Sequence, residues 1–293
     1  MNDLQVPVLL SIGFGYCARV LAARLKAENW HIAATAREEA KAQALRREGI
    51  DAHVWPPDDL FASLPERTHL LISAPPGETG DPVLGRYREA LLDRRDRIAW
   101  IGYLSTTAVY GDRQGGWVDE TATLNAASER GKRRVIAERE WLALAEHGLP
   151  VHTFRLAGIY GPGRGPFEKI RGGTAQRIVK EGQVFGRTHV EDIATVLQAS
   201  IACPEPGTAY NVTDDLTCPP QEVIGHAADL LGLPRPPLVP FETAEMSAMA
   251  RSFYGENKRV SNERIKQNLG VILAYPTYRE GLRAILETEH SAL

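Results

Sequence analysis

The stretch Val6-Pro-Val-Leu-Leu-Ser-Ile-Gly-Phe-Gly-Tyr-Cys-Ala-Arg-Val-Leu-Ala-Ala-Arg-Leu25 decides the fold. It begins with a continuous apolar run, passes through a turn that contains Gly13 and Gly15, and continues with apolar residues at helical spacing. A strand, a glycine turn and a helix in this order are typical of a dinucleotide-binding βαβ unit. Gly13 permits the tight turn, and Gly15 lets a pyrophosphate approach the backbone.

The predicted cofactor site is centred on this turn. The helix that follows directs its first N–H groups and the positive end of its dipole towards bound phosphates. A later predicted strand, residues 69–74, the fourth along the chain, is followed by Pro75-Pro76-Gly77 and contributes to the same site. The predicted cofactor-binding residues of the two segments are Gly13, Phe14, Gly15, Tyr16, Ala74 and Pro75.

The composition is that of an ordinary globular protein. The chain has 293 residues, of which 43% are hydrophobic and 24% charged, with a formal net charge of -3. This balance gives no electrostatic reason to expect nucleic acid or a membrane as partner. Three cysteines without CxxC spacing indicate neither a disulfide framework nor a zinc site. No cationic segment precedes the short apolar run, so we expect a cytoplasmic protein.

Strands and helices alternate through the first half of the chain. Predicted strands cover residues 30–37, 50–55, 69–74, 98–105 and 151–156, and predicted helices cover 38–48, 82–97 and 134–147. This alternation predicts an α/β fold with a doubly wound parallel sheet, a Rossmann domain over residues 1–165.

The second half of the chain has a looser pattern. Helices are predicted at residues 167–182, 192–202 and 219–232, and a strand at 209–213. The proline-rich residues 234–240 are predicted to be a linker or a wall. We therefore expect a smaller substrate domain over residues 166–293. It is interleaved with the first domain, because segments around 184–215 return to the Rossmann sheet.

Arg37 bears on the choice of cofactor. NAD-specific folds carry an acidic residue at the end of the second strand, whereas an arginine can pair with the 2′-phosphate of NADP. The sequence here is Thr35-Ala36-Arg37, which favours NADP and leaves NAD possible, since Glu38 and Glu39 follow directly. Both acids are also suited to the N-terminus of the next helix.

Several motifs resemble those of the extended short-chain dehydrogenase/reductase family, the nucleotide-sugar epimerases and dehydratases. Leu104-Ser-Thr-Thr-Ala-Val-Tyr-Gly111 resembles the family's strand-end motif, and Phe154-Arg-Leu-Ala-Gly-Ile-Tyr-Gly-Pro-Gly163 its entry to the substrate domain. His189-Val-Glu-Asp-Ile193 and Tyr210-Asn-Val212 are similar to later elements. The matches are collinear over about residues 8 to 215. The resemblance implies a Rossmann enzyme, with Thr106 orienting a substrate oxygen.

The family's Tyr-x-x-x-Lys pair, which transfers the proton while the nicotinamide transfers hydride, is missing. The resemblance places Arg130 at the tyrosine position and Arg134 at the lysine position, and no tyrosine lies between Tyr110 and Tyr160. Arginine stays protonated throughout the working pH range. A literal Tyr-x-x-x-Lys occurs only at Tyr254 to Lys258, outside the matching helix.

Three interpretations of this loss remain open. Another residue could supply the proton. Tyr110 and Tyr160 are the nearest candidates, and Tyr254 is the least favoured of the three. Arg130 could instead hold an anionic substrate or stabilise an oxyanion beside Thr106. The protein could also bind NADP(H) without turnover, as a sensor or scaffold.

The predicted catalytic residues are accordingly Thr106, Tyr110, Arg130 and Arg134. The predicted function is that of an NADP(H)-binding, atypical epimerase/dehydratase-like oxidoreductase for a sugar nucleotide or another small carbonyl or hydroxyl compound, with a catalytically silent NADP(H)-binding protein as the alternative. Arg155, Arg164 and Arg187 could meet a phosphorylated substrate or form structural pairs. Members of the family often pair through the helices beside the active site, so a homodimer is possible. No metal site is predicted, because acids such as Glu191 and Asp192 before a helix are usually caps.

Overall fold

The computed structural model describes residues 6–61 and 64–291. The chain forms two compact units, each made of three separate segments of the sequence. Unit 1 consists of Met1–Thr106, Lys132–Arg155 and Ala194–Tyr210. Unit 2 consists of Thr107–Gly131, Leu156–Ile193 and Asn211–Leu293.

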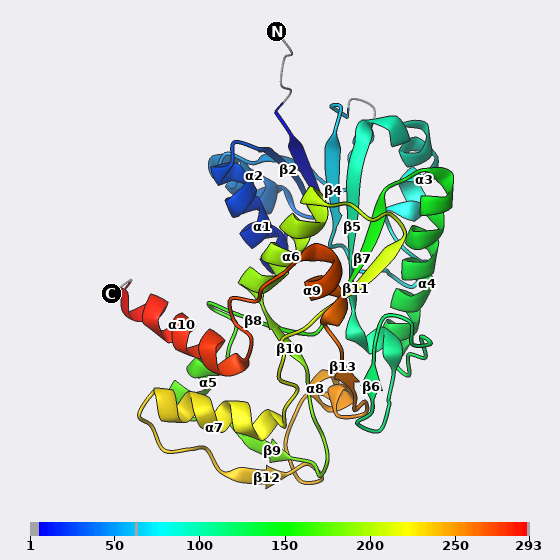
Figure 1. Ribbon diagram of the computed structural model, residues 1–293. Helices are drawn as coiled ribbons and strands as arrows, with labels where there is room; N and C mark the ends of the chain where they lie inside the picture. Colours follow the sequence, from blue (N-terminus) through cyan, green and yellow to red (C-terminus); the bar gives the residue numbers. More distant parts are fainter. Residues whose placement is uncertain (1–5, 62–63, 292–293) are drawn as a thin grey trace. The chain divides into compact units, whose positions relative to one another are not determined.

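A seven-stranded parallel sheet, most of which belongs to unit 1, has the order β11-β7-β5-β4-β1-β2-β3 (Figure 1). Its strands are β1 (Val8–Ile12), β2 (His31–Ala36), β3 (Asp51–Val54), β4 (Thr68–Ile72), β5 (Ile98–Thr106), β7 (Val151–Leu156) and β11 (Thr208–Val212). β1 pairs with β2 on one side and with β4 on the other. The order of the strands therefore reverses beside β1, and such a reversal opens a crevice at the carboxyl ends of the strands.

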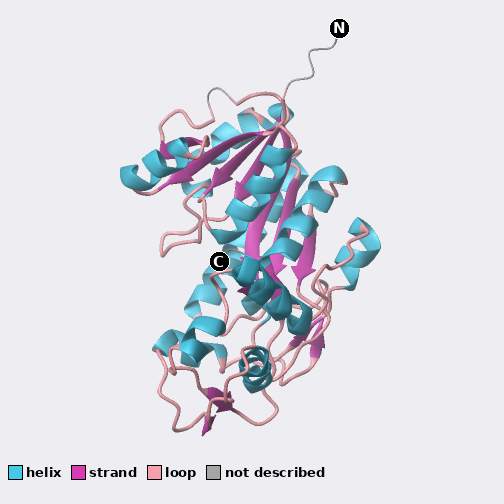
Figure 2. Cartoon of the chain, turned by 90° about the vertical axis from the view of Figure 1, so that its left-hand side faces the viewer, coloured by secondary structure: helices cyan, strands magenta, loops and turns pink. Residues whose placement is uncertain are grey.

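Helices cover both faces of this sheet (Figures 1 and 2). α1 (Tyr16–Ala27), α2 (Glu39–Arg47) and α6 (Val190–Ala202) lie on one face, and α3 (Leu84–Asp93) and α4 (Glu129–Ala143) on the other. Short 3-10 turns are η1 (Arg95–Arg97), η2 (Thr107–Tyr110) and η3 (Leu144–His147).

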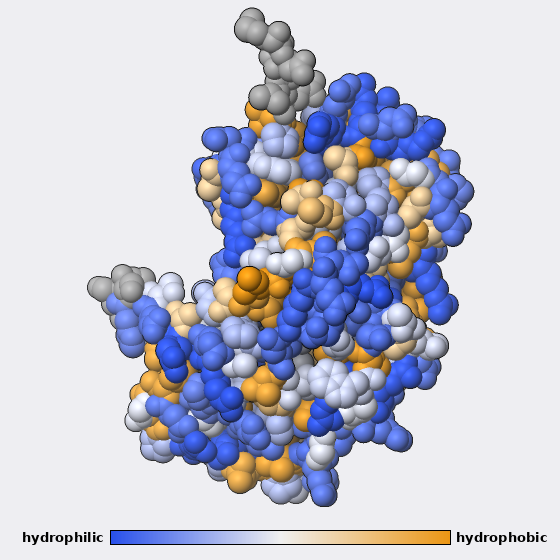
Figure 3. Space-filling model, viewed as in Figure 1, coloured by the Kyte–Doolittle hydropathy of each residue, from blue (hydrophilic) through white to orange (hydrophobic). Residues whose placement is uncertain are grey.

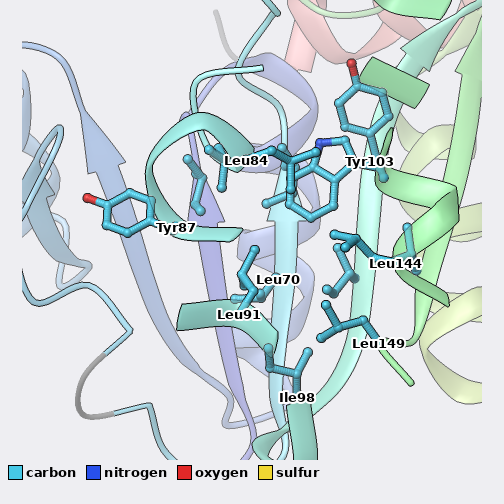
Figure 4. Packing of buried hydrophobic residues seen from close by; sticks show 14 of the residues in the cluster. Leu70, Leu84, Tyr87, Leu91, Ile98, Tyr103, Leu144 and Leu149 are labelled. Atoms are coloured by element: carbon cyan, nitrogen blue, oxygen red, sulfur yellow. The ribbon is translucent and has the colours of Figure 1, made fainter. Parts of the chain in front are cut away.

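Strand β5 is buried on both faces, and this explains why its sequence is apolar up to Leu104. Trp100 on one side of the strand donates its indole N–H to Ser200 of α6 at 3.0 Å, while Ile101 and Tyr103 pack with α3 and α4. A strand buried on both faces has no polar alternation. Figure 4 shows the α3–α4 side of this core, where Leu70, Leu91 and Tyr103 are among the labelled residues and are fully buried. Each such side chain contributes about 1.5–3 kcal/mol by leaving water.

Unit 2 is built from short parallel strand pairs and helices. β8 (Gly158–Tyr160) pairs with β10 (Arg187–His189), β9 (Arg177–Val179) with β12 (Leu238–Pro240), and β6 (Trp117–Val118) with β13 (Arg259–Val260). Its remaining helices are α5 (Phe167–Arg171), α7 (Pro220–Leu230), α8 (Ala248–Phe253), α9 (Glu263–Leu269) and α10 (Tyr278–Ser291). Tyr160, Phe167 and Leu282 are among the residues of its apolar core.

The predicted Rossmann elements are confirmed to within a few residues, whereas two predictions in the second half are wrong. The helix predicted over 167–182 ends at Arg171, since two glycines of low helix propensity follow, and the chain then forms β9. The segment predicted over 234–240 as a linker or wall contains β12, which pairs with β9. Hydrophilic side chains dominate the visible face in Figure 3. Among residues 6–61 and 64–291, no helix is both long and apolar enough to cross a membrane.

Candidate functional site

Gly13 forms the tight turn after β1 in a conformation that other residues rarely adopt. Its φ is +84°, and an added Cβ would lie 2.9 Å from the Ser73 hydroxyl oxygen and 3.2 Å from the Ala74 nitrogen. The turn thus requires glycine on both conformational and steric grounds. Ser73 and Ala74 both donate their backbone N–H to the Ile12 carbonyl, which fixes the end of β4 against the turn.

Three hydroxyl groups hold the backbone of Gly13. The Ser11 hydroxyl donates to the Gly13 carbonyl at 2.9 Å, and the Ser73 hydroxyl donates to the same oxygen. The Gly13 N–H donates to the Thr35 hydroxyl oxygen of β2 at 3.0 Å. Side chains from three neighbouring segments therefore set the orientation of this turn. Sequence reasoning missed them, because none of the three belongs to the glycine pattern.

Gly15, by contrast, leaves open space beside its backbone. It is the N-cap of α1, is exposed, and would place a Cβ with no other atom within 4 Å. The first turn of α1 carries no acidic side chain that would compete with an anion. A helix N-terminus approached over a bare glycine fits a pyrophosphate group. Phe14 is buried under the turn, and Tyr16 is half-buried at the start of the helix.

Arg37 follows the last residue of β2 and is exposed. In the part of the chain that the structure describes, its side chain has no ion pair or hydrogen bond. Glu39 is engaged instead, because it accepts hydrogen bonds from Arg46 at 2.8 Å and from Gln43 at 3.1 Å. These bonds hold the pKa of Glu39 below its usual value. The exposed Arg37 guanidinium is thus not engaged by the neighbouring Glu39.

The end of β5 is anchored by α4. Arg134 donates to the Leu104 carbonyl and to the Tyr103 hydroxyl, the latter at 3.2 Å, with its guanidinium 5.6 Å from the Tyr103 ring centre. Burial raises the pKa of the Tyr103 phenol, although the Arg134 charge opposes this. Thr106, the last residue of β5, is half-buried. Arg134 therefore holds the backbone just before the predicted substrate-orienting residue.

A buried ion pair supports the same strand. Glu138, which is 0% exposed, accepts hydrogen bonds from Arg155, 4% exposed, through Nε at 2.9 Å and through Nη2. Its other oxygen accepts from the Ser105 hydroxyl at 2.9 Å. Arg155 is thus a structural partner of Glu138, the second of the two roles considered for it.

The chain is similar to known proteins over nearly its whole length. It is 31% identical to Protein YeeZ of Escherichia coli K12 over 283 residues, covering 90% of this chain and 95% of that protein. A functionally unknown conserved protein from Silicibacter pomeroyi is 52% identical, with a TM-score of 0.88 over 96% of this chain and 99% of that chain. Human epimerase family protein SDR39U1 with NADPH is 19% identical, with a TM-score of 0.74 over 96% of this chain and 99% of that chain. No protein-family model matches.

The chain belongs to the NAD-dependent epimerase/dehydratase family, the extended short-chain dehydrogenases/reductases. Within this family fold, α4 is the helix that follows β5, and it carries Arg130 and Arg134 where the resemblance implies tyrosine and lysine. Arg130 is exposed in the first turn of the helix. Arg134 is turned towards β5, as described above. The helix supplies fixed positive charge and no proton at these two positions.

The three tyrosines considered as replacements for the family's tyrosine are buried in unit 2. Tyr110 is 0% exposed and donates its hydroxyl to Asn211 at 2.7 Å. Tyr160 is buried, and burial together with the nearby Asp214 raises the pKa of its phenol. Tyr254 packs against Phe185, with ring centres 5.2 Å apart, and burial raises its pKa as well. A phenol with a raised pKa is a poorer acid/base at neutral pH.

The literal Tyr-x-x-x-Lys sequence in unit 2 does not form a dyad. Lys258 pairs with Glu256 at 2.5 Å, and the Tyr254 backbone carbonyl accepts a hydrogen bond from Lys180. Asp192 is also structural, because its carboxylate accepts the N–H groups of Ala274 at 2.7 Å and Tyr275 at 3.1 Å. No group of three His, Cys, Asp or Glu side chains that could hold a metal occurs in the described ranges.

Asp214 is a buried acid that sequence reasoning did not single out. It is 4% exposed, and burial raises the pKa of its carboxyl to about 8, although the Arg187 charge opposes the shift. Arg187 itself donates to the Phe185 carbonyl at 3.0 Å and to the Cys218 sulfur at 3.3 Å. With a pKa of about 8, the carboxyl is largely neutral at pH 7.

Proposed function

We propose that this protein binds NADP(H) in unit 1 and acts as an oxidoreductase of the epimerase/dehydratase type on a small carbonyl or hydroxyl compound. The observation that carries the proposal is the turn between β1 and α1. Gly13 is confined by Ser73 and Ala74, whereas the space beside Gly15 is open at the start of a helix. A pyrophosphate fits this arrangement.

The preference for NADP rests on Arg37. The guanidinium is exposed at the end of β2, the position from which family folds contact the adenosine ribose. Glu39, one of the two acids that could compete for the ribose hydroxyls, is bonded to Arg46 and Gln43. Structures of the same fold contain NADPH in SDR39U1 and NAD in others, so the fold accommodates both cofactors. Pairing of Arg37 with the 2′-phosphate is charge-assisted.

Bound NADP(H) supplies the hydride in such a reaction. The contribution of this chain is positional: Thr106 at the end of β5 orients the substrate oxygen, and Arg134 with the Glu138–Arg155 pair fixes that strand end. Arg130, one helical turn before Arg134, places an exposed positive charge on the same helix face, where it favours an anionic substrate or a developing oxyanion.

The second candidate function is binding of NADP(H) without turnover. It is favoured by the placement of Arg134, which donates to the Leu104 carbonyl in the position where the family lysine assists proton transfer. It is also favoured by the burial of Tyr110, Tyr160 and Tyr254 inside unit 2. A sensor or scaffold protein needs the cofactor turn and Arg37 but no acid.

Cofactor titration tests the proposal directly. We expect NADPH to bind the wild-type protein more tightly than NADH in isothermal titration calorimetry. Arg37→Ala should weaken NADPH by roughly 10- to 100-fold, the effect of lost hydrogen bonds to a charged group, and should leave NADH unchanged. Arg47→Ala removes the same charge from the last turn of α2 and is the matched control. Equal affinity for NADH and NADPH would contradict the assignment of Arg37.

Turnover separates the two candidate functions. NADPH oxidation, NADP+ reduction and epimerisation should be assayed with sugar nucleotides, aldehydes, ketones and alcohols. Activity that falls in Thr106→Val, with cofactor affinity retained, supports the oxidoreductase. Tight NADPH binding without activity on any compound supports the silent protein.

A further inference from the structure

Thr35 ties β2 to the cofactor turn. The side chain is 2% exposed, and its hydroxyl oxygen accepts the Gly13 N–H at 3.0 Å. Backbone pairing of β1 with β2 runs from Val8 with His31 to Ser11 with Ala34. The Thr35 hydroxyl thus extends the connection between the two segments beyond the last backbone pair, up to the glycine itself.

Arg37 follows directly after the same strand. It lies two positions beyond Thr35 and one beyond Ala36, the last residue of β2. Thr35 is buried and bonded to the turn, and Arg37 is exposed and without a partner among the described residues. A single residue, Ala36, therefore separates Thr35, which is bonded to the cofactor turn, from Arg37, which is proposed to bind the 2′-phosphate.

We propose that Thr35 is a positioning residue for cofactor choice, which couples Arg37 at the 2′-phosphate to the Gly13 turn at the pyrophosphate. This inference rests on the proposed function, because it requires that Arg37 recognises NADP(H). NADPH presents two anionic groups at a fixed separation, so both protein sites must keep a fixed separation as well. NADH lacks the 2′-phosphate and needs only the turn and the ribose contacts.

Ser73 provides the comparison that isolates this coupling. Its hydroxyl also holds Gly13, by donating to the carbonyl of the same residue, but it follows β4 and lies on the other side of β1 from β2. Loss of the Ser73 bond loosens the turn without loosening its link to Arg37. Loss of the Thr35 bond loosens the turn and also its link to Arg37.

The experiment is a double-mutant cycle on cofactor affinity. Thr35→Val keeps the shape of the side chain and removes the acceptor, Thr35→Ser restores the acceptor, and Ser73→Ala is the matched control. Affinities for NADPH and NADH are measured by calorimetry for each variant, for Arg37→Ala and for Thr35→Val/Arg37→Ala. Thermal midpoints and circular dichroism verify that each variant is folded.

We expect Thr35→Val to weaken NADPH by roughly tenfold, the effect of one hydrogen bond, and NADH by clearly less. Thr35→Ser should restore the preference, and Ser73→Ala should weaken both cofactors equally. In the Thr35→Val background, Arg37→Ala should have a smaller effect on NADPH than in the wild type, since coupled residues are not additive.

Strictly additive effects of Thr35→Val and Arg37→Ala, or equal loss for both cofactors in Thr35→Val, would overturn the coupling while leaving the proposed function intact. Failure of the wild type to prefer NADPH would instead overturn the proposed function. If Thr35→Val does not fold, Thr35→Ala takes its place, since it also removes the acceptor of the Gly13 N–H. A weakened NADPH preference in Thr35→Ala but not in Ser73→Ala would support the coupling, and identical behaviour of these two variants would contradict it.

Discussion

Replacing Arg155 with Met should destabilise unit 1 severely. Arg155 is 4% exposed and provides two of the three side-chain hydrogen bonds to Glu138, which is 0% exposed. The variant keeps the volume of the side chain but leaves a buried carboxylate with Ser105 as its remaining bonded partner. Removal of one member of a buried ion pair costs about 3–5 kcal/mol. Replacement of both members, Glu138→Gln with Arg155→Met, should cost less than Arg155→Met alone, because no charge is then left buried.

Urea unfolding at pH 7 measures these differences. Intrinsic fluorescence reports on unit 1, because Trp100 and Trp141 are fully buried in it. The control is Arg86→Met, whose partner Asp58 lies at 2.6 Å but is 88% exposed, so the loss should stay within about 1 kcal/mol. A cost below about 1 kcal/mol for Arg155→Met, or a double variant less stable than Arg155→Met, would refute the reasoning about an uncompensated buried charge.

Three further predictions follow from single side chains. Burial raises the pKa of Asp214 to about 8, above the unfolded value, so its stabilisation is fully present below the unfolded pKa and is lost as pH rises through about 8. Urea unfolding from pH 5 to 9 should therefore show the wild type losing stability relative to Asp214→Asn as pH rises. Gly13→Ala should lower the thermal midpoint, because the φ of Gly13 is +84° and the Ser73 hydroxyl oxygen lies 2.9 Å from the added Cβ. Gly15→Ala should leave the thermal midpoint unchanged and should weaken the affinity for NADPH in titration calorimetry, because no atom lies within 4 Å of its added Cβ. Tyr110→Phe leaves the Asn211 oxygen without its 2.7 Å donor and should cost about 1–3 kcal/mol in urea unfolding, with no change in cofactor affinity.

The Rossmann half of the fold could be predicted because its information is local. A buried strand such as β1 is a continuous apolar run, and α1 repeats its apolar residues at helical spacing. The short strands of unit 2 lack such a signal. β9 has three half-buried residues and pairs with β12, some sixty residues later in the chain. Pairing at that distance is decided by tertiary contacts rather than by periodicity, and the region was therefore predicted as helix and linker.

The candidate site could likewise be predicted from the sequence only in part. The glycine turn and Arg37 could be proposed from spacing, because a bare helix N-terminus and a cation after the second strand are encoded within a few residues. Thr35 and Ser73 escaped notice, since their importance lies in a hydrogen bond to Gly13 from other strands. Tyr110 was considered as an acid from its position in a motif, and its bond to Asn211 depends on a residue 101 positions later.

Helix α4 holds the end of β5 through two polar side chains. Arg134 and Glu138 are four residues apart and so lie on one face of the helix. Arg134 binds the Leu104 carbonyl, and Glu138 binds the Ser105 hydroxyl. The face that carries acid/base chemistry in the family thus anchors the last residues of β5 in this chain. Because that anchoring fixes Thr106 without supplying a proton, restoring lysine at position 134 alone should remove the anchor without creating an acid.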